Sequence, residues 1–344
     1  MDKRVIFAVA GAGKTTRIIS GLDLEKRFLI VTYTDNNLST LRYKIIAKFG
    51  FFPKNISLYS YFSFLHAFCF KPFLLFKAKT KGINFQQPPE WTMRLKRSNL
   101  AYYIDSHKRL YHNRIAKLIE ASEVLPDVIQ RVEKYFDVLC FDEVQDFGGH
   151  DFNLITALSK SNVDSLFVGD FYQHTFDTSR DGATNKNLHN DFQKYKKCFE
   201  NAGLIVDTTS LVKSHRCSET VCKFISEYMG IEIYSQTGHI AEVKLVEQQV
   251  EVDSLHSCPN TVKLFYKEHD RYDCYSQNWG GSKGQDHYGD VCVVLTTETC
   301  KGYKNGDLKG INAQTKNKLY VACSRARGNL YLVPETLMRK FKQA

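Results

Sequence analysis

The chain has 344 residues, of which 43% are hydrophobic, and it carries a formal net charge of +10. This length is sufficient for two hydrophobic cores of ordinary domain size. The sequence has no apolar run of about 18 residues and no charged-then-apolar leader at its start, so we expect a cytoplasmic protein without a membrane span or a secretory signal. None of its ten cysteines belongs to a Cys-x-x-Cys pair, which favours reduced, mostly buried thiols over a zinc or cluster site.

A glycine-rich segment follows the first predicted strand, Val5 to Val9, and leads into a predicted helix. Its small residues allow backbone N–H groups to close on phosphates, while a lysine reaches the β and γ oxygens and a threonine hydroxyl ligates Mg²⁺. A tight turn that only packed a helix on a strand would not need the lysine. We therefore expect a nucleotide site with Thr15 as a metal ligand, made by Ala10, Gly11, Ala12, Gly13, Lys14, Thr15 and Thr16.

An acidic run, Asp142 to Asp146, follows the apolar strand Val138 to Phe141. Open α/β sheets bind ligands at the carboxyl ends of their strands. We expect Asp142 to hold Mg²⁺ and Glu143 to polarise the attacking water, because these roles need one ligand and one general base. The alternative, a solvated acidic turn, is less consistent with a chain that also carries Lys14.

Strands and helices are predicted to alternate, which indicates a parallel sheet covered on both faces. The first sheet would use Val5 to Val9, Phe28 to Tyr33, Ile56 to Tyr59, Val138 to Phe141 and Ser165 to Val168, with helices at Thr15 to Gly21 and Asn36 to Phe49. A second sheet would use Ile205 to Leu211, Val243 to Val246, Val262 to Phe265, Val291 to Leu295 and Asn329 to Val333.

These motifs resemble those of the UvrD, PcrA and Rep group of superfamily 1 helicases, whose acidic motif has the same Asp-Glu-x-Gln-Asp form. The resemblance implies an α/β fold with two RecA-like parallel-sheet motor lobes and a small basic helical insertion in the first lobe. Residues 1–70 and 122–204 would form the first lobe, 71–121 the insertion, and 205–344 a second lobe that lacks a large insertion. The other similar segments, in the expected order, are Val31 to Thr34, Val168 to Gln173, His215-Arg216, Ser282 to Asp286 and Tyr320 to Arg327.

The resemblance also implies residue roles. Gln173 would sense the γ-phosphate, and Arg216 and Arg325 would complete the ATP site from the second lobe. Such arginines accelerate hydrolysis by about 10³ to 10⁵ in related enzymes. Gly284 and Asp286 would join the nucleotide-binding residues, although the family has glutamate where this chain has Asp286. The implied nucleic-acid contacts are Thr32, Thr34 and Phe176.

Three departures from the family pattern predict a reduced motor. The upstream glutamine segment that reads adenine has no room before Val5, which leaves selectivity for ATP open. Thr178 stands at the position of a base-stacking tryptophan, and Arg180 is displaced by one residue. The interval from Arg216 to Lys283 is too short for the large insertion of full-length members.

The segment from Lys71 to Lys117 contains eleven lysines and arginines but only two acidic residues, so it accounts for a charge of +9. Aromatic residues are interleaved through it, as on surfaces that bind single-stranded nucleic acid. We expect phosphate contacts from Arg94, Lys96 and Arg97. The alternative is a solvated helical face over an aromatic core, and core positions are favoured for Phe73, Phe76, Tyr103 and Tyr111.

These features predict a translocase or helicase that uses ATP and Mg²⁺ and acts on single-stranded or partly duplex DNA, moving 3′ to 5′ by resemblance. A second hypothesis is a non-unwinding, DNA-stimulated ATPase that serves as a switch or sensor with a partner protein such as a nuclease. A small-molecule kinase is disfavoured, because it leaves Gln173, Arg216 and the run Ser324 to Arg327 unexplained.

Overall fold

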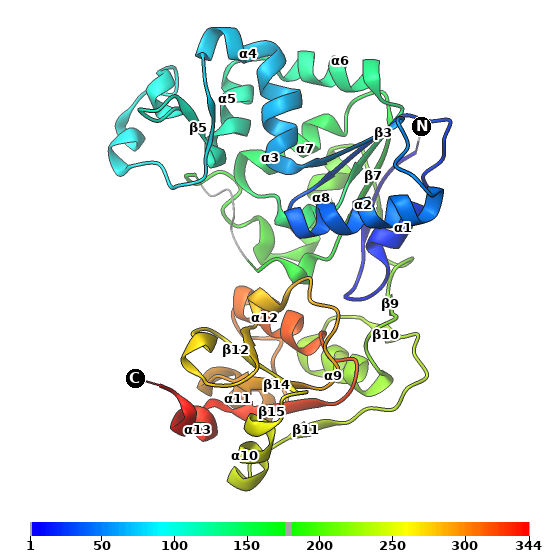
Figure 1. Ribbon diagram of the computed structural model, residues 1–344, viewed down its shortest axis with the longest axis vertical. Coiled ribbons are helices and arrows are strands. Elements are labelled where there is room, and N and C mark those ends of the chain that lie inside the picture. The colour runs from blue at the N-terminus through cyan, green and yellow to red at the C-terminus, as the bar shows by residue number, and fades with distance from the viewer. Residues whose placement is uncertain (1, 176–180, 344) are drawn as a thin grey trace. The chain divides into compact units, whose positions relative to one another are not determined.

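A computed structural model describes residues 2–175 and 181–343 of the chain (Figure 1). The fold consists of two compact units. Three of their boundaries fall at segments with predicted functions, namely the glycine-rich loop, the segment Val168 to Gln173, and Phe176. The first unit contains Met1–Ile6, Thr15–Gly169 and Asp177–Asp207. The second unit contains Phe7–Lys14, Asp170–Phe176 and Thr208–Ala344. The glycine-rich loop therefore belongs to the unit that carries the C-terminal arginines.

The first unit is built on a six-stranded sheet with the order β3-β2-β6-β7-β1-β8. The chain moves from β1 to β2 and β3 in one direction along the sheet and returns through β6 and β7 in the other. Right-handed crossovers therefore place helices on both faces (Figure 1). The strands are β1 (Lys3–Phe7), β2 (Phe28–Thr32), β3 (Ile56–Ser60), β6 (Val138–Phe141), β7 (Asp164–Gly169) and β8 (Ile205–Asp207).

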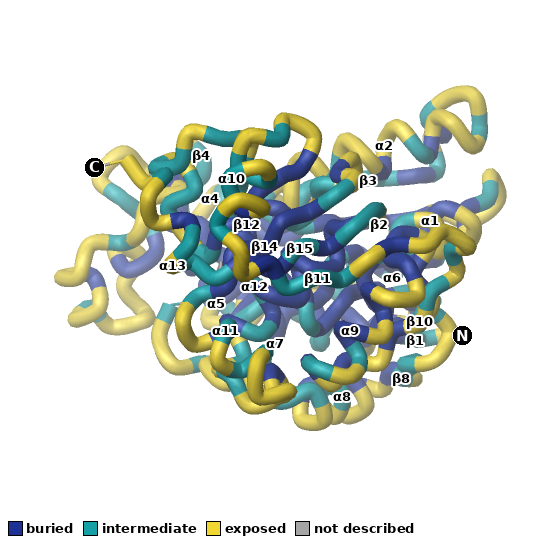
Figure 2. Tube along the Cα trace, turned by 90° about the horizontal axis from the view of Figure 1, so that it is seen from below, coloured by how far each residue is buried: buried dark blue, intermediate teal, exposed yellow. Residues whose placement is uncertain are grey.

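Helices cover this sheet, and much of the outer side of α2 (Asp35–Phe49) is exposed (Figure 2). Residues 64–70 form a π-helical segment between α3 (Tyr61–Ser63) and α4 (Lys71–Ala78). The helices outside the insertion are α1 (Lys14–Ser20), α2 (Asp35–Phe49), α3 (Tyr61–Ser63), α6 (Leu125–Tyr135), α7 (Gly149–Leu158) and α8 (Phe192–Asn201).

The register of β2 aligns the ends of three neighbouring strands. Thr32 lies opposite Ser60 of β3, and Val31 lies opposite Phe141 of β6, both in parallel pairs. Every residue of β2 and β6 is buried, as expected for parallel strands covered on both faces. The segments that begin at Tyr33, Tyr61 and Asp142 therefore all leave the sheet at the same edge.

The basic insertion is not wholly helical. It contains α4 (Lys71–Ala78) and α5 (Ile115–Ala121), and a two-stranded parallel sheet of β4 (Gly82–Asn84) and β5 (Arg109–Tyr111). The expectation of a core position is confirmed for Tyr103 and Tyr111, which are 1% and 4% exposed. It is wrong for Phe76, which is 93% exposed. The helix α4 packs through Leu74, and a residue two positions further on points away from the packed side.

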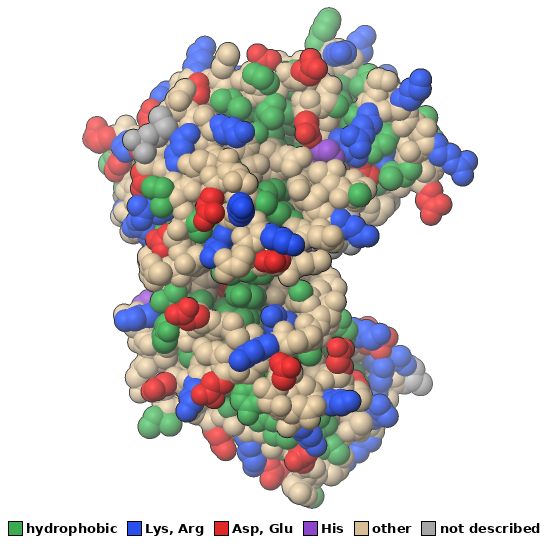
Figure 3. Space-filling view, turned by 180° about the vertical axis from the view of Figure 1, so that it is seen from behind, with side chains coloured by type: hydrophobic (Ala, Val, Ile, Leu, Met, Phe, Trp, Pro, Cys, Tyr) green, Lys and Arg blue, Asp and Glu red, His purple; other side chains and the backbone are tan. Residues whose placement is uncertain are grey.

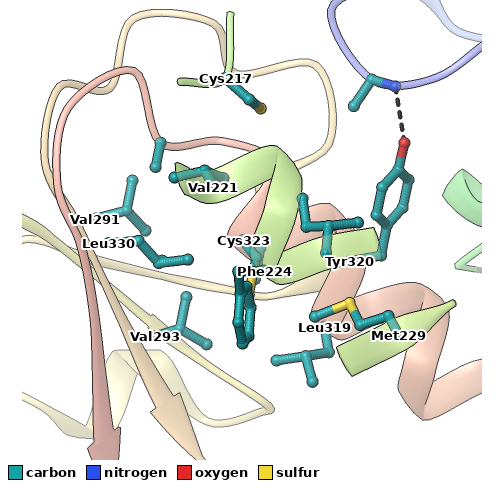
Figure 4. Packing of buried hydrophobic residues seen from close by; sticks show 14 of the residues in the cluster. Cys217, Val221, Phe224, Met229, Val291, Val293, Leu319, Tyr320, Cys323 and Leu330 are labelled. Atoms are coloured by element: carbon teal, nitrogen blue, oxygen red, sulfur yellow. Dashed lines mark hydrogen bonds between the residues drawn. The ribbon is translucent and has the colours of Figure 1, made fainter. Parts of the chain in front are cut away.

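The second unit contains a five-stranded sheet with the order β11-β15-β14-β12-β13, in which all the pairs are parallel. Figure 4 shows its core, in which Val291, Val293 and Leu330 of the strands face Val221 and Phe224 of α9 (Glu219–Met229). The elements are β9 (Lys213–Ser214), α9 (Glu219–Met229), β10 (Tyr234–Ser235), β11 (Val243–Leu245), α10 (Gln249–Ser257), β12 (Val262–Phe265), β13 (Ser276–Asn278), β14 (Val291–Leu295), α11 (Thr297–Lys304), α12 (Ala313–Cys323), β15 (Leu330–Pro334) and α13 (Glu335–Met338).

One predicted strand belongs to the other sheet. Ile205 to Leu211 was expected to open the second sheet, but Ile205–Asp207 forms β8 and pairs with β1 in the first. The open edge of β1 accepts these residues in register, from Arg4 opposite Ile205 to Ile6 opposite Asp207. Among the helices of residues 2–175 and 181–343, none combines the length and the apolar character needed to cross a membrane.

Candidate nucleotide and nucleic-acid sites

The glycine-rich loop has a backbone that only glycine adopts without strain. Gly11 and Gly13 have φ angles of +73° and +87°. A Cβ atom on Gly11 would lie 2.7 Å from the Ser214 hydroxyl oxygen and 2.9 Å from the Arg216 Cβ. The loop therefore packs against the segment that carries Arg216 with no room for a side chain at Gly11. The His215 N–H donates a 3.0 Å hydrogen bond to the Gly11 carbonyl, which fixes this approach.

A tyrosine joins the loop to the segment that contains Gln173. The backbone N–H of Ala10 donates a 2.8 Å hydrogen bond to the Tyr320 hydroxyl. That hydroxyl donates in turn to the Asp170 carboxylate at 3.0 Å, and the same carboxylate oxygen accepts the Gln173 Nε2–H at 2.9 Å. Burial and the neighbouring Asp170 charge raise the pKa of Tyr320 well above its ordinary value, so the phenol stays protonated at neutral pH.

The two C-terminal arginines share one carboxylate. Arg216 Nη2 bonds Asp286 Oδ1, and Arg325 Nη1 lies 3.4 Å from the same oxygen. Arg216 Nη1 also donates to the Ser324 carbonyl at 3.1 Å. Burial and the adjacent Arg216 lower the pKa of Arg325 to about 10, which still leaves it charged at neutral pH. The Asp286 side chain is 60% exposed, so these guanidinium groups meet beside solvent.

The geometry of the arginines fits an anionic ligand. Arg216 Nε is buried without a hydrogen-bond partner among the described residues. An unpaired charged donor is costly to bury, and a phosphate oxygen would satisfy it. Gly284, which was expected to bind nucleotide together with Asp286, is exposed. Its φ of +81° lies in the left-handed region, so its backbone also favours glycine.

The acidic motif lies in the first unit, directly after β6. Asp142 is 2% exposed and accepts the Glu143 backbone N–H at 3.1 Å. Glu143 itself has φ +56° and ψ +48°, a left-handed conformation that costs a non-glycine residue about 1–3 kcal/mol. Its carboxylate accepts the side-chain amide of Gln145. A Cβ on Gly169 would lie 2.5 Å from Gln145 Oε1, so the glycine at the end of β7 makes room for this amide.

The residues present fit Mg²⁺. Thr15 is half-buried at the start of α1 and Asp142 is buried at the end of β6, and both belong to the first unit. The described residues hold no group of three or more His, Cys, Asp or Glu side chains that could bind a metal. Mg²⁺ does not need one, because it binds through one or two protein oxygens together with phosphates and water. Of the remaining loop residues, Lys14 is half-buried and Thr16 is exposed.

An open groove of about 660 Å³ lies at the edge of the first sheet where β2 and β3 end. Its walls include Tyr33 and Thr34 after β2, Phe62 and His66 after β3, and Phe85 after β4. The Phe62 and Phe85 rings meet edge to face at 5.3 Å, and Phe85 is 62% exposed. Exposed rings beside a polar strand edge form the kind of surface on which bases stack.

The residues expected to bind nucleic acid differ in their burial and in their position relative to the groove. Thr34 lines the groove and its hydroxyl also caps α2 by accepting the Asn37 N–H at 3.2 Å. Thr32 is fully buried at the end of β2. Phe176 lies outside the described residues, as do Thr178 and Arg180. The three expected phosphate contacts are exposed and do not line the groove: Arg94, Lys96 and Arg97.

Two cations of the basic insertion are buried. Arg114 and Lys117 are 1% and 3% exposed, and both bond the Asp181 carboxylate, at 3.1 and 2.7 Å. Lys117 also donates to the Tyr102 hydroxyl at 2.7 Å. Arg114 and Lys117 therefore do not face solvent. They anchor the insertion to Asp181, which follows Gln173 in the sequence. Figure 3 shows other Lys and Arg side chains gathered on the surface of the first unit that carries the insertion.

Sequence reasoning missed three of these features. The segment Ser60 to His66 had a usable signal, because it follows a strand that neighbours β2 and therefore leaves the sheet at the same edge. The part played by Tyr320 had none, since its partner Ala10 is 310 positions away. The same holds for Asp181, which contacts Arg114 across 67 positions.

No protein-family model matches the chain, and no curated protein matches it. Among solved structures the chain is similar to the complex of arterivirus nonstructural protein 10 (helicase) with DNA, at 13% identity and a TM-score of 0.53, over 96% of this chain and 60% of that one. Further matches are a PRRSV helicase (16% identity, TM-score 0.47, 97% and 52% covered) and arterivirus nonstructural protein 10 (helicase) (14%, 0.48, 96% and 59%).

The chain thus spans about 60% or less of the length of these helicases. At such low identity the likeness shows a shared fold, which is the expected α/β fold with two RecA-like parallel sheets. It does not single out the UvrD, PcrA and Rep group.

Proposed function

We propose that the protein is an ATP-dependent translocase or helicase that acts on single-stranded DNA. The observation that carries this proposal is the arrangement within the second unit. There, the glycine-rich loop, the Gln173 segment and Arg216 are held together through Tyr320 and the close approach of Gly11. Fold-stabilising contacts alone would not require a phosphate-type loop to contact the backbone of a charged arginine.

The proposed chemistry is hydrolysis of a nucleoside triphosphate. Lys14 and the loop N–H groups would hold the phosphates, and Thr15 with Asp142 would hold Mg²⁺, which neutralises charge on the β and γ oxygens. Glu143 would accept a proton from the attacking water, and its fixed backbone and its bond from Gln145 would orient it.

The remaining groups would stabilise developing charge and sense the nucleotide. Arg216 and Arg325 are both charged and lie together at Asp286, so a γ-phosphate could replace that carboxylate as their partner. Gln173 would report the presence of the γ-phosphate, because its amide bonds the aspartate that Tyr320 links to the loop.

The strand would bind in the groove of the first unit. Phe62 and Phe85 offer rings for stacking, and Ser60, Ser63 and Thr34 offer hydroxyls for the backbone. DNA rather than RNA is proposed from the family resemblance and from the DNA bound to the similar arterivirus protein. Movement from 3′ to 5′ is proposed on the family resemblance alone.

A direct test is ATP turnover with and without single-stranded DNA. We expect hydrolysis that requires Mg²⁺, rises several-fold with a single strand, and stops when EDTA is added. GTP, CTP and UTP in the same assay determine base selectivity. Absence of any Mg²⁺-dependent nucleotide hydrolysis would contradict the proposal.

A second candidate is an ATPase switch that binds a strand and a partner protein, such as a nuclease, without unwinding. The observation that favours it is the interval between Arg216 and Lys283, which is occupied by α9, α10 and short strands of the second unit and has no additional subdomain. A forked duplex with a 3′ or a 5′ tail separates the candidates. Strand-stimulated hydrolysis without unwinding of either fork would favour the switch, and unwinding of the 3′-tailed fork would favour the motor.

A further inference from the structure

The basic insertion encloses a second cavity, of about 220 Å³, apart from the groove. It lies between α4, the segment Arg97 to Tyr103 and the end of α5. Leu74 and Leu118 form buried apolar walls, and Leu100 adds a partly exposed one. None of the residues that line this cavity also lines the groove at the ends of β2 and β3.

Tyr103 gives this cavity a polar group without a partner. Its side chain is 1% exposed and lines the cavity, and its hydroxyl has no hydrogen-bond partner among the described residues. Burial and the neighbouring Tyr102 raise its pKa above the ordinary value, so the hydroxyl remains a donor at neutral pH. Buried hydroxyl groups normally have a partner, and a ligand with an acceptor atom would supply one.

Two cations at the cavity lack an acidic partner. Lys77 and Arg97 line it, both are exposed, and neither forms an ion pair with any described residue. Three other cations of the insertion are already paired, since Arg109 bonds Asp105, and Arg114 and Lys117 bond Asp181. The cavity therefore combines apolar walls with an uncompensated positive rim, which matches a ligand with a compact apolar body and an attached anion.

The volume restricts that ligand further. Sites for drug-sized molecules usually measure about 300–1,000 Å³, so this cavity has room for one or two fused rings and not for a peptide or a nucleoside triphosphate. A nucleobase has this size, with apolar faces, acceptor atoms on its edge and phosphates on both sides. In a single strand, a base can leave its neighbours at little cost.

We propose that one base of the bound single strand enters this cavity, while its flanking phosphates contact Lys77 and Arg97. This inference deepens the proposed function and rests on it, because it assigns part of the strand to the insertion. The leucine walls would hold any base by its faces, and the Tyr103 hydroxyl would donate to an acceptor on its edge. The cavity would thus supply a base contact in addition to the groove at Phe62 and Phe85.

The test uses the full chain and a thymidine oligonucleotide that carries one 2-aminopurine, moved along the strand from one oligonucleotide to the next. The fluorescence of this base rises when it leaves the stack. We expect one position to respond beyond the others in the wild-type protein. An abasic site at that position should weaken binding about tenfold, a typical effect of losing one base contact.

A variant that fills the cavity tests whether the fluorescence response arises there. Ala121 is exposed and lines the cavity, so Ala121→Trp places an indole there without replacing a core residue. It should abolish the position-specific fluorescence and the effect of the abasic site. The matched control is Ala47→Trp, which adds the same ring to an exposed alanine of α2 and should behave as the wild type. A second variant, Lys77→Glu, should weaken the same response by adding repulsion at the rim.

The outcomes are distinguishable. If the wild-type protein binds no oligonucleotide, the proposed function fails. If it binds but no position responds, or if Ala121→Trp and Lys77→Glu both leave the response unchanged, the base cavity is overturned while the proposed function stands. If free 2-aminopurine nucleotide binds at an Ala121→Trp-sensitive site and the strand does not, the strand is excluded as the occupant.

Discussion

The backbone N–H of Ala10 and the phenol of Tyr320, 310 positions apart in sequence, are joined by a buried 2.8 Å hydrogen bond in the second unit (Figure 4). The phenol donates a hydrogen bond to the Asp170 carboxylate, which also accepts one from the Gln173 amide. One side chain of α12 therefore links the phosphate loop to the residue proposed to sense the γ-phosphate.

Replacement of Tyr320 by phenylalanine should impair turnover more than nucleotide affinity. The variant leaves the Ala10 N–H and the Asp170 carboxylate short of a partner, at about 1–3 kcal/mol for each unpaired group. A loop displaced by 1 Å can lose about 10²-fold in rate, so we expect kcat to fall on that order while KM changes less. The control is Tyr303→Phe, whose ring packs on Tyr228 at the surface of the same unit. Equal kcat values for wild type and Tyr320→Phe would exclude this positioning role.

Replacement of Glu143 by glutamine should stop hydrolysis and preserve nucleotide binding. Loss of a general base costs about 10²–10⁴-fold in rate. Single-turnover hydrolysis and binding of a fluorescent ATP analogue measure the two effects separately. Glu123→Gln is a matched control, because Glu123 is an exposed glutamate with a similar left-handed φ of +59°. Normal turnover by Glu143→Gln would exclude Glu143 as the base.

The affinity for single-stranded DNA should depend strongly on salt. If roughly four to six phosphates are contacted, log affinity should fall with log salt at a slope of about −3 to −4. The double variant Arg94→Ala, Lys96→Ala should reduce the magnitude of that slope by about 1.4. Lys54→Ala with Lys160→Ala removes the same charge from exposed positions outside the insertion and should leave it unchanged. A slope near zero for the wild type would contradict the proposed phosphate contacts.

Replacement of Asp181 by asparagine should destabilise the first unit. It leaves Arg114 and Lys117 buried without their carboxylate, which costs about 3–5 kcal/mol in comparable cases. Urea unfolding at pH 7 measures the loss, with the exposed Asp270→Asn as the control. An unfolding free energy equal to that of the wild type would contradict the role of this pair.

The same contacts predict an acid-sensitive contribution to stability. Burial opposes ionisation of Asp181, but hydrogen bonds from Lys117, Arg114 and Tyr102 outweigh it, so its pKa lies below the ordinary 3.8. Because the folded pKa is the lower one, the carboxylate stabilises the fold above about pH 3.8. This contribution is lost as the pH falls through the folded pKa. The stability difference between wild type and Asp181→Asn should therefore narrow at acidic pH.

The sheets were predictable because their strands are short apolar runs. Val138–Phe141, Val262–Phe265 and Val291–Leu295 have the predicted ends. Local pattern does not say which sheet a strand joins, so Ile205–Asp207 was assigned to the wrong one. It also does not say which side of a helix packs, so Phe76 was placed in the core although 93% of it is exposed.

The candidate site was predictable in its residue types and not in its connections. A motif identifies Lys14, Glu143 and Gln173 by the chemistry they supply. The hydrogen bond between Ala10 and Tyr320 joins residues that are 310 positions apart. The carboxylate that Arg216 and Arg325 share belongs to Asp286, which is 70 positions from Arg216 and 39 from Arg325. No local spacing encodes such contacts, because they arise only when the second unit assembles.

The roles proposed for Arg216 and Arg325 are tested by kcat for ATP, with saturating single-stranded DNA, in Arg216→Lys and Arg325→Lys. Lysine keeps the charge but loses the planar fork of donors, so kcat should fall by about 10³-fold or more while binding of a fluorescent ATP analogue persists. Arg327→Lys, exposed and two positions from Arg325, should retain wild-type turnover. An active wild type with undiminished kcat in both Arg216→Lys and Arg325→Lys would contradict the proposed roles of these arginines in ATP hydrolysis.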